Sequence, residues 1–385
     1  MWFNPSTGET RRHRFTTTRA QLTEAVRLFP GSRVVFEIQP GAGPCADVLR
    51  SLGVPFRVGN TTEDSFRWKH RKTKTDARDA LQLAKLEAVG DLHPVHVPEA
   101  SVREHASLQS ERDGLVHDRT RVKNRIHALL ACHWQDAPAG EALWPAAGLA
   151  RLAVIKTEAL ARGSELGGQL DRTLRHLVHL NGLIAEVIKR LDALAPTRPA
   201  IARLQTLPGI GPRTAEALVA TIDKPGRFRN GKQLDAYLGF VPRVYQSGET
   251  LRHGPITKAG NRRLRALLVQ AAWVAVEHDA HWKALFERFG GATKPRRRTA
   301  IVAVARRLGI AAWALMRHGT TSTGATHHDS DDLNTSASVF FLSCRDVTAR
   351  ITSQRYHTSA RPRAGATTPI GRMGDVARVE FYEGG

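Results

Sequence analysis

The feature that most constrains the fold of this chain is a long run of regularly spaced apolar residues between positions 166 and 194. Leucine, isoleucine or valine occupies positions 166, 170, 174, 177, 180, 184, 187, 191 and 194. Steps of three and four residues are typical of a coiled-coil seam, because such residues share one face of a helix. A second helical pattern covers residues 99–133. The sequence therefore predicts a helical region at 99–200, in which the second long helix packs on the first or pairs with another subunit.

Ahead of these helices, short strands and helices alternate. A helix is expected over residues 19–29, and the apolar run at 33–38 ends at Pro40. Its short length and β-branched residues favour a buried strand. A helix at about 44–52 and a strand at 54–58 follow, with Gly53 as the helix end. This order is typical of an α/β domain, which we place at residues 1–98.

Three acids in this region form a candidate metal site. Glu37 lies at the end of the predicted strand, while Asp76 and Asp79 share the first turn of the next helix, which Thr73 or Thr75 would cap. Each acid also has an ordinary explanation, since a strand end reaches solvent and acids favour a helix N-terminus. Together, three carboxylates suit Mg²⁺, which takes oxygen ligands. Such ions activate the attacking oxygen in phosphodiester chemistry.

The chain is strongly basic, with 57 Lys and Arg against 36 Asp and Glu, a net charge of +21. An excess of this size calls for a polyanionic partner, and the usual one is nucleic acid. The basic residues beside the candidate acids would hold phosphates: Arg67, Lys69, Arg71, Lys72 and Lys74.

Other classes of protein are disfavoured. Cys45, Cys132 and Cys344 lie far apart, which argues against a disulfide framework and a zinc ribbon. The chain has no run of about 18 apolar residues, so no membrane span is expected, and its first residues lack the layout of a signal peptide. We therefore expect a cytoplasmic protein associated with the nucleoid and with no membrane partner.

Residues 201–319 are predicted to form a compact all-helical domain after a linker at 195–200. The segment Leu207-Pro-Gly-Ile-Gly211 resembles a helix-hairpin-helix turn, in which the amides of Gly209 and Gly211 would meet a DNA phosphate. An ordinary turn between helices is the alternative. After Gly319 the composition shifts to Ser, Thr, Gly and Arg, and a disordered tail is expected at 320–385.

A second dense group of polar residues follows this turn. Ser247 and a glycine lie in a predicted loop at 240–257, ahead of a helix expected at 261–277. The serine is a phosphate contact, a nucleophile or ordinary loop polarity, because no general base is evident beside it. The basic start of the next helix would bind nucleic acid through five residues: Lys258, Asn261, Arg262, Arg263 and Arg265.

These motifs, in this order, resemble the DEDD transposases of bacterial insertion sequences, which are described as RNA-bridged recombinases. The resemblance covers about residues 1–319. Its blocks are Val34-Val-Phe-Glu37, Lys74-Thr-Asp76-Ala-Arg-Asp79-Ala80, Leu207-Pro-Gly-Ile-Gly211, Ser247-Gly, and Ile256-Thr-Lys258-Ala-Gly-Asn261-Arg-Arg-Leu-Arg265. Each block alone is weak, and their joint occurrence is specific.

The resemblance implies an α/β RuvC-like domain of the ribonuclease-H type, long coiled-coil helices and a helical transposase domain. Glu37, Asp76 and Asp79 match the second, third and fourth acids of a Mg²⁺ site, and Ser247 matches a serine that attacks DNA. The partners implied are the DNA of the element ends and target, a guide RNA, and further copies of the chain through the coiled coil. No acid on a convincing strand precedes Glu37, so we expect the α/β domain to be incomplete, with its first strand missing.

Three readings of function follow. The first is a recombinase of an insertion sequence that cuts and rejoins DNA with Mg²⁺ and Ser247, with activity lost if the chain is truncated. The second is a RuvC-like junction-resolving nuclease that uses acids and water only. The third is a non-catalytic remnant that binds DNA or RNA. Replacing Ser247 separates the first two readings, because only a serine recombinase needs that hydroxyl.

Overall fold

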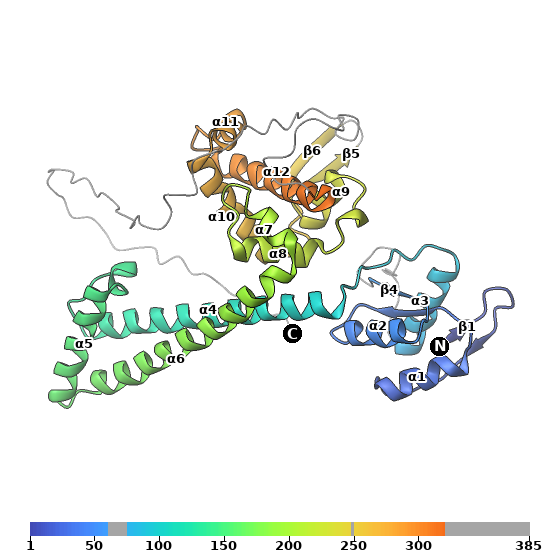
Figure 1. Cartoon of the computed structure of the whole chain (residues 1–385), viewed down its shortest axis with the longest axis horizontal. Helices are drawn as coiled ribbons and strands as arrows, with labels where there is room; N and C mark the ends of the chain where they lie inside the picture. The colour runs from blue at the N-terminus through green and yellow to red at the C-terminus, as the bar shows by residue number, and fades with distance from the viewer. Residues whose placement is uncertain (61–74, 248–249, 320–385) are drawn as a thin grey trace. The chain divides into compact units, whose positions relative to one another are not determined.

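A computed structural model describes residues 1–60, 75–247 and 250–319 of the chain. Over these residues the chain is mostly helical, and its strands pair into three two-stranded sheets (Figure 1). The predicted tail at 320–385 and the basic residues from Arg67 to Lys74 lie outside the described residues.

The first segment is an α/β unit built around a parallel strand pair. Its elements are β1 (Trp2–Phe3), β2 (Thr10–Arg11), α1 (Arg19–Leu28), β3 (Val34–Glu37), α2 (Ala42–Ser51), β4 (Phe56–Gly59) and α3 (Asp76–Ala88). Strands β3 and β4 are parallel, with Val34 opposite Phe56 and Glu37 opposite Gly59. Helix α2 is the crossover between them, as a parallel pair requires. The predicted helices and strands of this region are confirmed to within a few residues.

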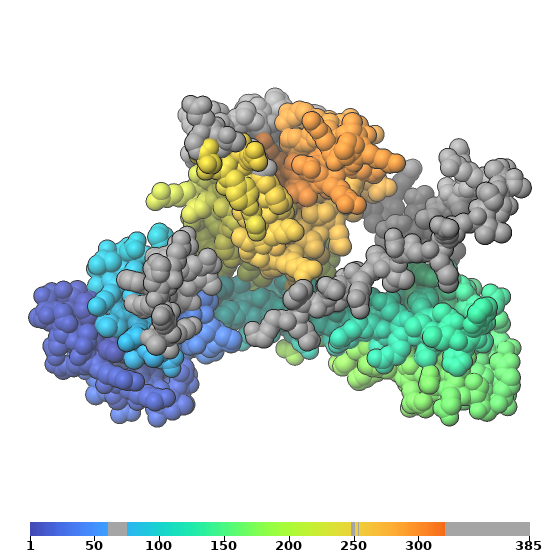
Figure 2. Space-filling model, turned by 180° about the vertical axis from the view of Figure 1, so that it is seen from behind, coloured from blue at the N-terminus to red at the C-terminus, as the bar shows by residue number. Residues whose placement is uncertain are grey.

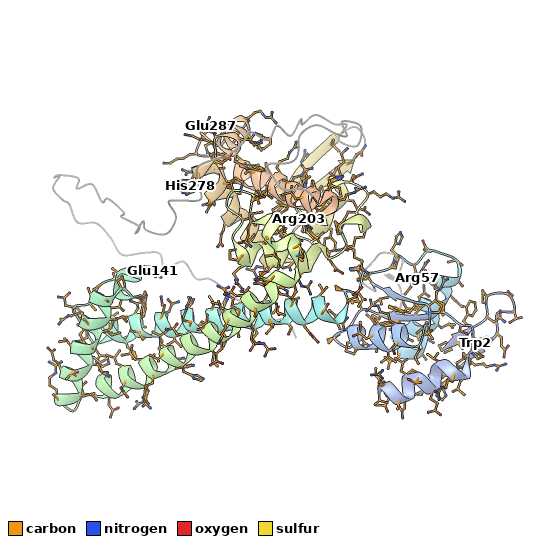
Figure 3. The ribbon with its side chains drawn as sticks, viewed as in Figure 1. Trp2, Arg57, Glu141, Arg203, His278 and Glu287 are labelled. Carbon is orange, nitrogen blue, oxygen red and sulfur yellow. The ribbon has the colours of Figure 1, made fainter. Side chains whose placement is uncertain are left out.

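Two small apolar clusters hold this unit together, one on each face of the strand pair. Phe36 packs with Val58 and Ala46, whereas Val35 packs with Leu83 and Leu86 of α3. Adjacent residues of a strand point to opposite faces, so β3 serves both clusters. Strand β3 is half-buried along its whole length, whereas a buried strand was predicted. Arg57, labelled in Figure 3, and Arg33 both pair with Glu87 at the end of α3.

The middle segment contains two long helices that lie side by side (Figure 1). They are α4 (Ala100–Cys132) and α6 (Glu165–Leu194), joined through a short 3-10 helix (Gly140–Leu143) and α5 (Ala146–Ala161). The predicted seam is confirmed, since Leu170, Leu180 and Leu191 are buried along α6. Its partners include α4 and α5 of the same chain. Residues 136–150 are rich in Pro, Gly and Ala, a composition that favours a loop, but α5 begins within this stretch after Pro145.

The third segment packs its helices around one large core. Its helices are α7 (Pro199–Leu204), α8 (Pro212–Ile222), α9 (Gly231–Leu238), α10 (Arg262–His278), α11 (Ala280–Arg288) and α12 (Arg297–His318). Leu218, Leu268 and Leu308 are fully buried in this core. The linker predicted at 195–200 is a 3-10 turn (Ala195–Thr197) that runs into α7, and helix α11 was not predicted.

The third segment is not all-helical, as was predicted from the sequence, because it contains a pair of strands. The loop predicted at 240–257 is a β-hairpin of β5 (Pro242–Ser247) and β6 (Thr250–Ile256). Every residue of β5 is exposed. An exposed strand needs no alternation of apolar and polar residues, and that alternation is the main sequence signal for a half-buried strand. Figure 2 shows this part of the chain, in yellow, at the surface.

Helix α12 is long and apolar enough to cross a membrane by length and composition, and it is the one such helix among residues 1–60, 75–247 and 250–319. Half of its most apolar stretch is buried inside the chain. Val304, Ala305 and Leu308 form part of the third segment's core. A central core helix has the same composition, so the helix is weak evidence for a membrane span.

Candidate active site

The acids predicted to bind a metal lie on two elements that touch. Glu37 ends β3 and its side chain is half-buried. Asp76 and Asp79 occupy the first turn of α3, where Asp76 is exposed and Asp79 half-buried. Helix α3 packs against β3. The structure therefore places the strand and the helix of the predicted site next to each other.

Thr75 fixes where α3 begins. Its backbone is extended, and its hydroxyl oxygen accepts a hydrogen bond from the Arg78 amide at 3.4 Å. This is the geometry of a helix N-cap, which satisfies an amide that has no partner within the helix. Of the two threonines predicted as a cap, Thr75 is therefore the one that caps α3. This cap places Asp76 and Asp79 at the positive end of the helix dipole.

The donor chemistry of these acids fits a divalent cation, but their arrangement is incomplete. Carboxylate oxygens are the ligands that Mg²⁺ prefers. Within the described ranges, which omit 61–74, no group of three or more His, Cys, Asp or Glu side chains is close enough to hold a metal ion. Glu37, Asp76 and Asp79 therefore do not form a gathered ligand set in this structure, and their metal role stays a prediction.

Ser247 is the last residue of β5, at the tip of the exposed hairpin. The register pairs Tyr245 with Arg252 and Gln246 with Leu251 across the strands. Directly opposed residues share a face of the ribbon, and so do residues two apart on one strand. Tyr245, Arg252 and Ser247 consequently lie on one face.

The two faces of the hairpin differ in chemistry. The face of Ser247 carries a cation and an aromatic ring, and Gly254 leaves room there, since a β-carbon on it would lie 3.0 Å from the Tyr245 ring. The other face carries Val244, Gln246 and Leu251, and the two apolar side chains are 56% and 54% exposed. A cationic face suits a phosphate backbone and an apolar face suits a protein surface. This asymmetry was not predicted, because Ser247 was expected to lie in a loop.

Two glycines close the base of the hairpin. Gly239 has a φ of +75° and Gly260 has a φ of +69°, a region that favours glycine. A β-carbon on Gly239 would lie 2.2 Å from the Ala259 oxygen, and one on Gly260 would lie 2.1 Å from the Tyr237 oxygen. The Lys258 amide also donates to the Gly239 oxygen at 3.1 Å. The end of α9 and the segment before α10 are thus held together by backbone contact.

The basic block after the hairpin has two kinds of member. Lys258 and Arg262 are exposed, and in the described structure neither has a hydrogen-bond or ion-pair partner through its side chain. Asn261 caps α10, accepting from the Leu264 amide at 3.1 Å. The exposed pair is available to an anion, whereas Asn261 serves the helix start.

The other two arginines of this block are engaged with the protein. Arg263 forms an ion pair with Asp113 of α4 and donates to Gln109 at 3.3 Å. Burial lowers the pKa of Arg263, and the Asp113 carboxylate opposes that shift. Arg265 donates to the backbone oxygens of Leu238 and Ala259. Phosphate contact by Arg263 and Arg265 stays a prediction, and both side chains already have a structural role.

The predicted helix-hairpin-helix turn also has two parts. Gly209 has a φ of +79°, and a β-carbon on it would lie 2.1 Å from the Ala271 oxygen. Its backbone therefore packs on α10, as in the alternative reading of an ordinary turn. Gly211 caps α8, is exposed and has open space around it. The N-terminus of α8 is thus the part of this turn that a phosphate can reach.

An ion pair between a buried acid and a partly exposed arginine supports the site and was not predicted from the sequence. Asp235 of α9 is fully buried and pairs with Arg306 of α12 at 2.5 Å. Burial raises the pKa of Asp235, and the hydrogen bond from Arg306 opposes this shift. The pair ties α9, whose C-terminal end leads into the hairpin, to the core helix. One acid in an amphipathic helix gives no sequence signal of burial, since most such acids face solvent.

Two protein-family models match parts of the chain. Residues 4–134 match a model described as transposase, of the IS110 DEDD type, and residues 201–287 match the model of the transposase IS116/IS110/IS902 family. A probable family 20 transposase of Pseudomonas aeruginosa is 30% identical over 288 residues, which is 74% of this chain and 84% of the relative.

Transposases of two further insertion sequences are similar over most of their length. The transposase of element IS1328 from Yersinia enterocolitica is 28% identical over 80% of this chain and 90% of the relative. The transposase of element IS1111A from Coxiella burnetii is 27% identical over 80% of this chain and 84% of the relative.

Proposed function

Since this chain belongs to the IS116/IS110/IS902 family of insertion-sequence transposases, we propose that it cuts and rejoins DNA strands with Ser247 as the nucleophile. The observation that carries the proposal is the position of Ser247 at the tip of an exposed ribbon, on the same face as Arg252. A nucleophile must reach a phosphodiester inside a bulky polyanion. An exposed tip with a cation beside it provides both access and charge neutralisation.

In the proposed cleavage, the Ser247 oxygen attacks the phosphorus of one phosphodiester. A phosphorus–oxygen bond to serine forms while the bond to the 3′ oxygen of the neighbouring nucleotide breaks. The serine proton leaves to a base or solvent, and the 3′ oxygen takes up a proton. Attack of another strand's 3′ hydroxyl on the phosphoserine rejoins the DNA and restores the serine, so no external energy source is needed.

The neighbours of Ser247 would orient the DNA strand. Arg252 neutralises phosphate charge on the same face of the ribbon, and the Tyr245 ring offers a stacking surface. Both side chains are positioning residues in this proposal. Lys258, Arg262 and the N-terminus of α8 at Gly211 are the further cationic or amide groups open to phosphates, whereas Lys72 and Lys74 lie outside the described residues.

Glu37, Asp76 and Asp79 are proposed to hold Mg²⁺ in an α/β domain of the ribonuclease-H type. The parallel β3–β4 pair with α3 packed on it supports that fold, as does the acid position at the strand end. A bound cation would stabilise negative charge on the phosphate under attack. The carboxylates themselves would shift toward one another on binding, since they are not gathered in the present structure.

The proposed partners are the DNA of the element ends and target, a guide RNA and further copies of the chain. The net charge of +21 supports the nucleic-acid partners. Trp134 at the end of α4 is 94% exposed and Val178 of α6 is 70% exposed, which supports self-association through the long helices.

The decisive experiment compares Ser247→Ala with Gln246→Ala, which lies next to it on the opposite face of the ribbon. The purified chain is incubated with Mg²⁺ and DNA that carries an element end, and protein–DNA adducts that survive denaturation are measured. Ser247→Ala should lose the adduct and Gln246→Ala should keep it. If Ser247→Ala still cuts the DNA, the chain is a nuclease that uses water, and the serine mechanism is wrong.

A further inference from the structure

The long helices enclose a basic groove that the proposed recombination chemistry does not use. A hollow of about 390 Å³ is lined by six residues of α4 and α6: Arg125, Leu129, Gln169, Arg172, Thr173 and His176. A second hollow of about 310 Å³ is lined by Asp118, Arg121, Val122, Arg125 and His176. The hollows share Arg125 and His176, so they lie next to each other along the helix pair, and we call the two together the groove between α4 and α6.

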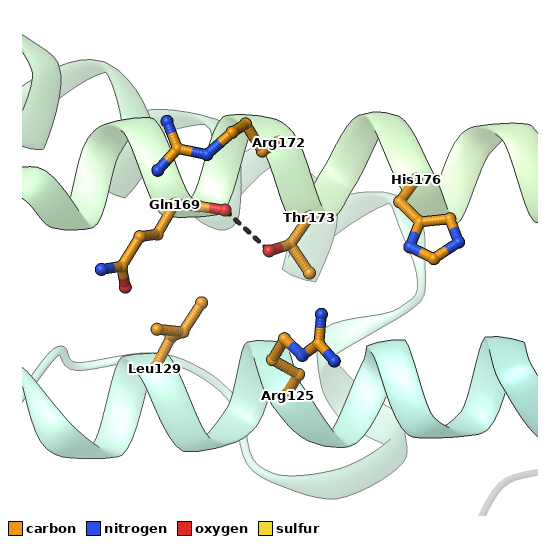
Figure 4. Close-up of a pocket in the computed structure, with 6 residues that line it drawn as sticks. All are labelled: Arg125, Leu129, Gln169, Arg172, Thr173 and His176. Carbon is orange, nitrogen blue, oxygen red and sulfur yellow. Dashed lines mark hydrogen bonds between the residues drawn. The ribbon is translucent and has the colours of Figure 1, made fainter.

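The side chains in this groove leave positive charge uncompensated. Figure 4 shows Arg125 of α4 directed toward Thr173 and His176 of α6. The guanidinium groups of Arg125 and Arg172 have no hydrogen-bond or ion-pair partner in the described ranges. Asp118 is the acid that lines the groove, and it is paired with Arg121. Two arginines are therefore available to an anion, while the one acid is already neutralised.

The form of the groove favours a linear polyanion over a small one. Arg121 and Arg125 lie one helical turn apart on α4, roughly 6 Å along the axis. Arg121 is paired with Asp118, so the free cations of the groove are Arg125, which lines both hollows, and Arg172 on the facing helix. Figure 4 shows the guanidinium groups of these two arginines apart from each other. Leu129, which is half-buried, supplies apolar surface beside these cations. Charge along the groove suits successive phosphates, and the apolar surface suits sugars or bases.

We propose that the groove between α4 and α6 binds the sugar–phosphate backbone of a single nucleic-acid strand, with Arg125 and Arg172 as its phosphate contacts. The site is separate from Ser247 and the acids, and it does not depend on the cleavage mechanism. Its role is to hold a strand on the long helices while the hairpin acts on DNA. The Thr173 hydroxyl donates to the Gln169 backbone oxygen at 2.7 Å, so the free polar contact from that turn is the Gln169 side chain.

The test uses a double variant, Arg125→Gln with Arg172→Gln, in the full chain. The matched control is Lys189→Gln with Arg190→Gln, which removes the same charge from exposed positions of α6 outside the groove. The probes are a labelled single-stranded RNA, a single-stranded DNA of the same sequence and the corresponding DNA duplex. Binding is measured over a series of salt concentrations.

The groove variant should bind the single strands at least tenfold more weakly at about 0.15 M salt. The slope of log K against log salt should fall by roughly 1.4, since a single strand loses about 0.7 for each phosphate contact. The control should keep that slope. A loss confined to RNA identifies RNA as the occupant, and equal losses for RNA and DNA indicate recognition of the backbone alone.

Three results would overturn the proposal. Equal losses in the groove and control variants would mean a general charge effect, and a loss confined to duplex DNA would mean that no single strand lies there. A changed molar mass in light scattering with unchanged strand binding would make the groove a contact between copies of the chain. Ser247→Ala should bind all three probes normally, so failure of the groove and failure of the nucleophile are distinguishable.

Discussion

The helical segment at 201–319 and the α/β segment at 1–98 carry different parts of the candidate site, and they differ in how firmly packing holds those parts. The helical segment has one core that extends from α7 to α12. The α/β segment has two small clusters, around Val58 and around Leu86. Buried apolar area is the main source of stability. We therefore expect the helical segment to hold its backbone and charged groups more firmly than the α/β segment does.

The candidate site reflects this difference. In the helical segment, Gly239, Gly260 and Arg265 are locked by contacts with the backbone of neighbouring elements. In the α/β segment, Asp76 is exposed and the predicted metal ligands are not gathered. The support for the hairpin is therefore preformed, whereas the predicted ligands would have to move together to hold a cation.

The strongest test of the comparison is Arg306→Met, which leaves the buried Asp235 without its partner. Loss of one partner of a fully buried pair costs about 3–5 kcal/mol, and we expect about 3 kcal/mol here because the Arg306 side chain is 38% exposed. The counterpart in the α/β segment is Arg33→Met, whose side chain is 51% exposed and whose partner Glu87 keeps Arg57. That change should cost less than about 1 kcal/mol. Urea denaturation followed by tryptophan fluorescence measures both, and equal losses would contradict a firmer helical segment.

The second test uses two glycines that share a left-handed conformation but differ in surroundings. Gly209→Ala places a β-carbon 2.1 Å from the Ala271 oxygen, whereas Gly53→Ala, at a φ of +67°, meets nothing within 4 Å. Backbone strain costs each variant about 1 kcal/mol. The clash with α10 should add about 2 kcal/mol in Gly209→Ala. The same denaturation measurement applies, and similar losses would mean that α10 moves aside easily.

Much of the helical fold was predictable from the sequence, because long helices leave a periodic pattern. Most positions of the seam from Leu166 to Leu194 are buried, and Thr75, one of the two threonines predicted as a cap, caps α3. The hairpin at 242–256 was not predicted, since its exposed residues have no burial pattern to reveal. Helix α5 was missed at a Pro- and Gly-rich stretch whose composition favours a loop.

The candidate site was predictable as a set of residue types, but its geometry was not. The sequence singled out Ser247 and Arg263 equally. The structure separates them, because Ser247 is exposed on the hairpin while Arg263 pairs with Asp113 of a distant helix. Such pairing depends on how helices pack across long sequence separations, and a single sequence carries no record of it.

The third test measures how the free energy of unfolding depends on pH. We expect this dependence to come mainly from titratable groups that are buried against the helical segment. His105 of α4 is 2% exposed, and burial with the nearby Arg198 and Arg213 lowers its pKa to about 4. An unfolded histidine takes up a proton near pH 6.5. The stabilising contribution of neutral His105 is therefore complete above pH 6.5, and it is lost as the pH falls toward 4. Between pH 7 and pH 5 the loss should be roughly 2 kcal/mol.

The control for this effect is His105→Leu, which should remove that part of the pH dependence. Burial raises the pKa of Glu216, so this acid binds a proton more readily in the folded chain than in the unfolded chain. Its contribution to stability therefore increases as the pH falls, opposite to that of His105. The difference between the wild-type and variant profiles isolates the histidine. Identical profiles would show that His105 is hydrated, and would weaken the contrast between the two segments.

The smallest expected effect is the most local, and it tests the α/β segment directly. Thr75→Ala removes the oxygen that accepts from the Arg78 amide. Loss of a threonine cap costs about 1 kcal/mol. Because α3 rests on a small cluster, this loss should appear as faster amide exchange in the first turn of α3, with little change in overall stability. Thr75→Ser should restore slow exchange, since serine caps equally well.

The counterpart in the helical segment is Asn261→Ala, which removes the corresponding cap of α10. Helix α10 is part of the large core, so its first turn should stay protected and the cost should be shared by the whole segment. If both variants loosen only their own first turns, the two segments hold their helix starts equally. The idea that the α/β acids wait for a ligand while the hairpin support is preformed would then lose its physical basis.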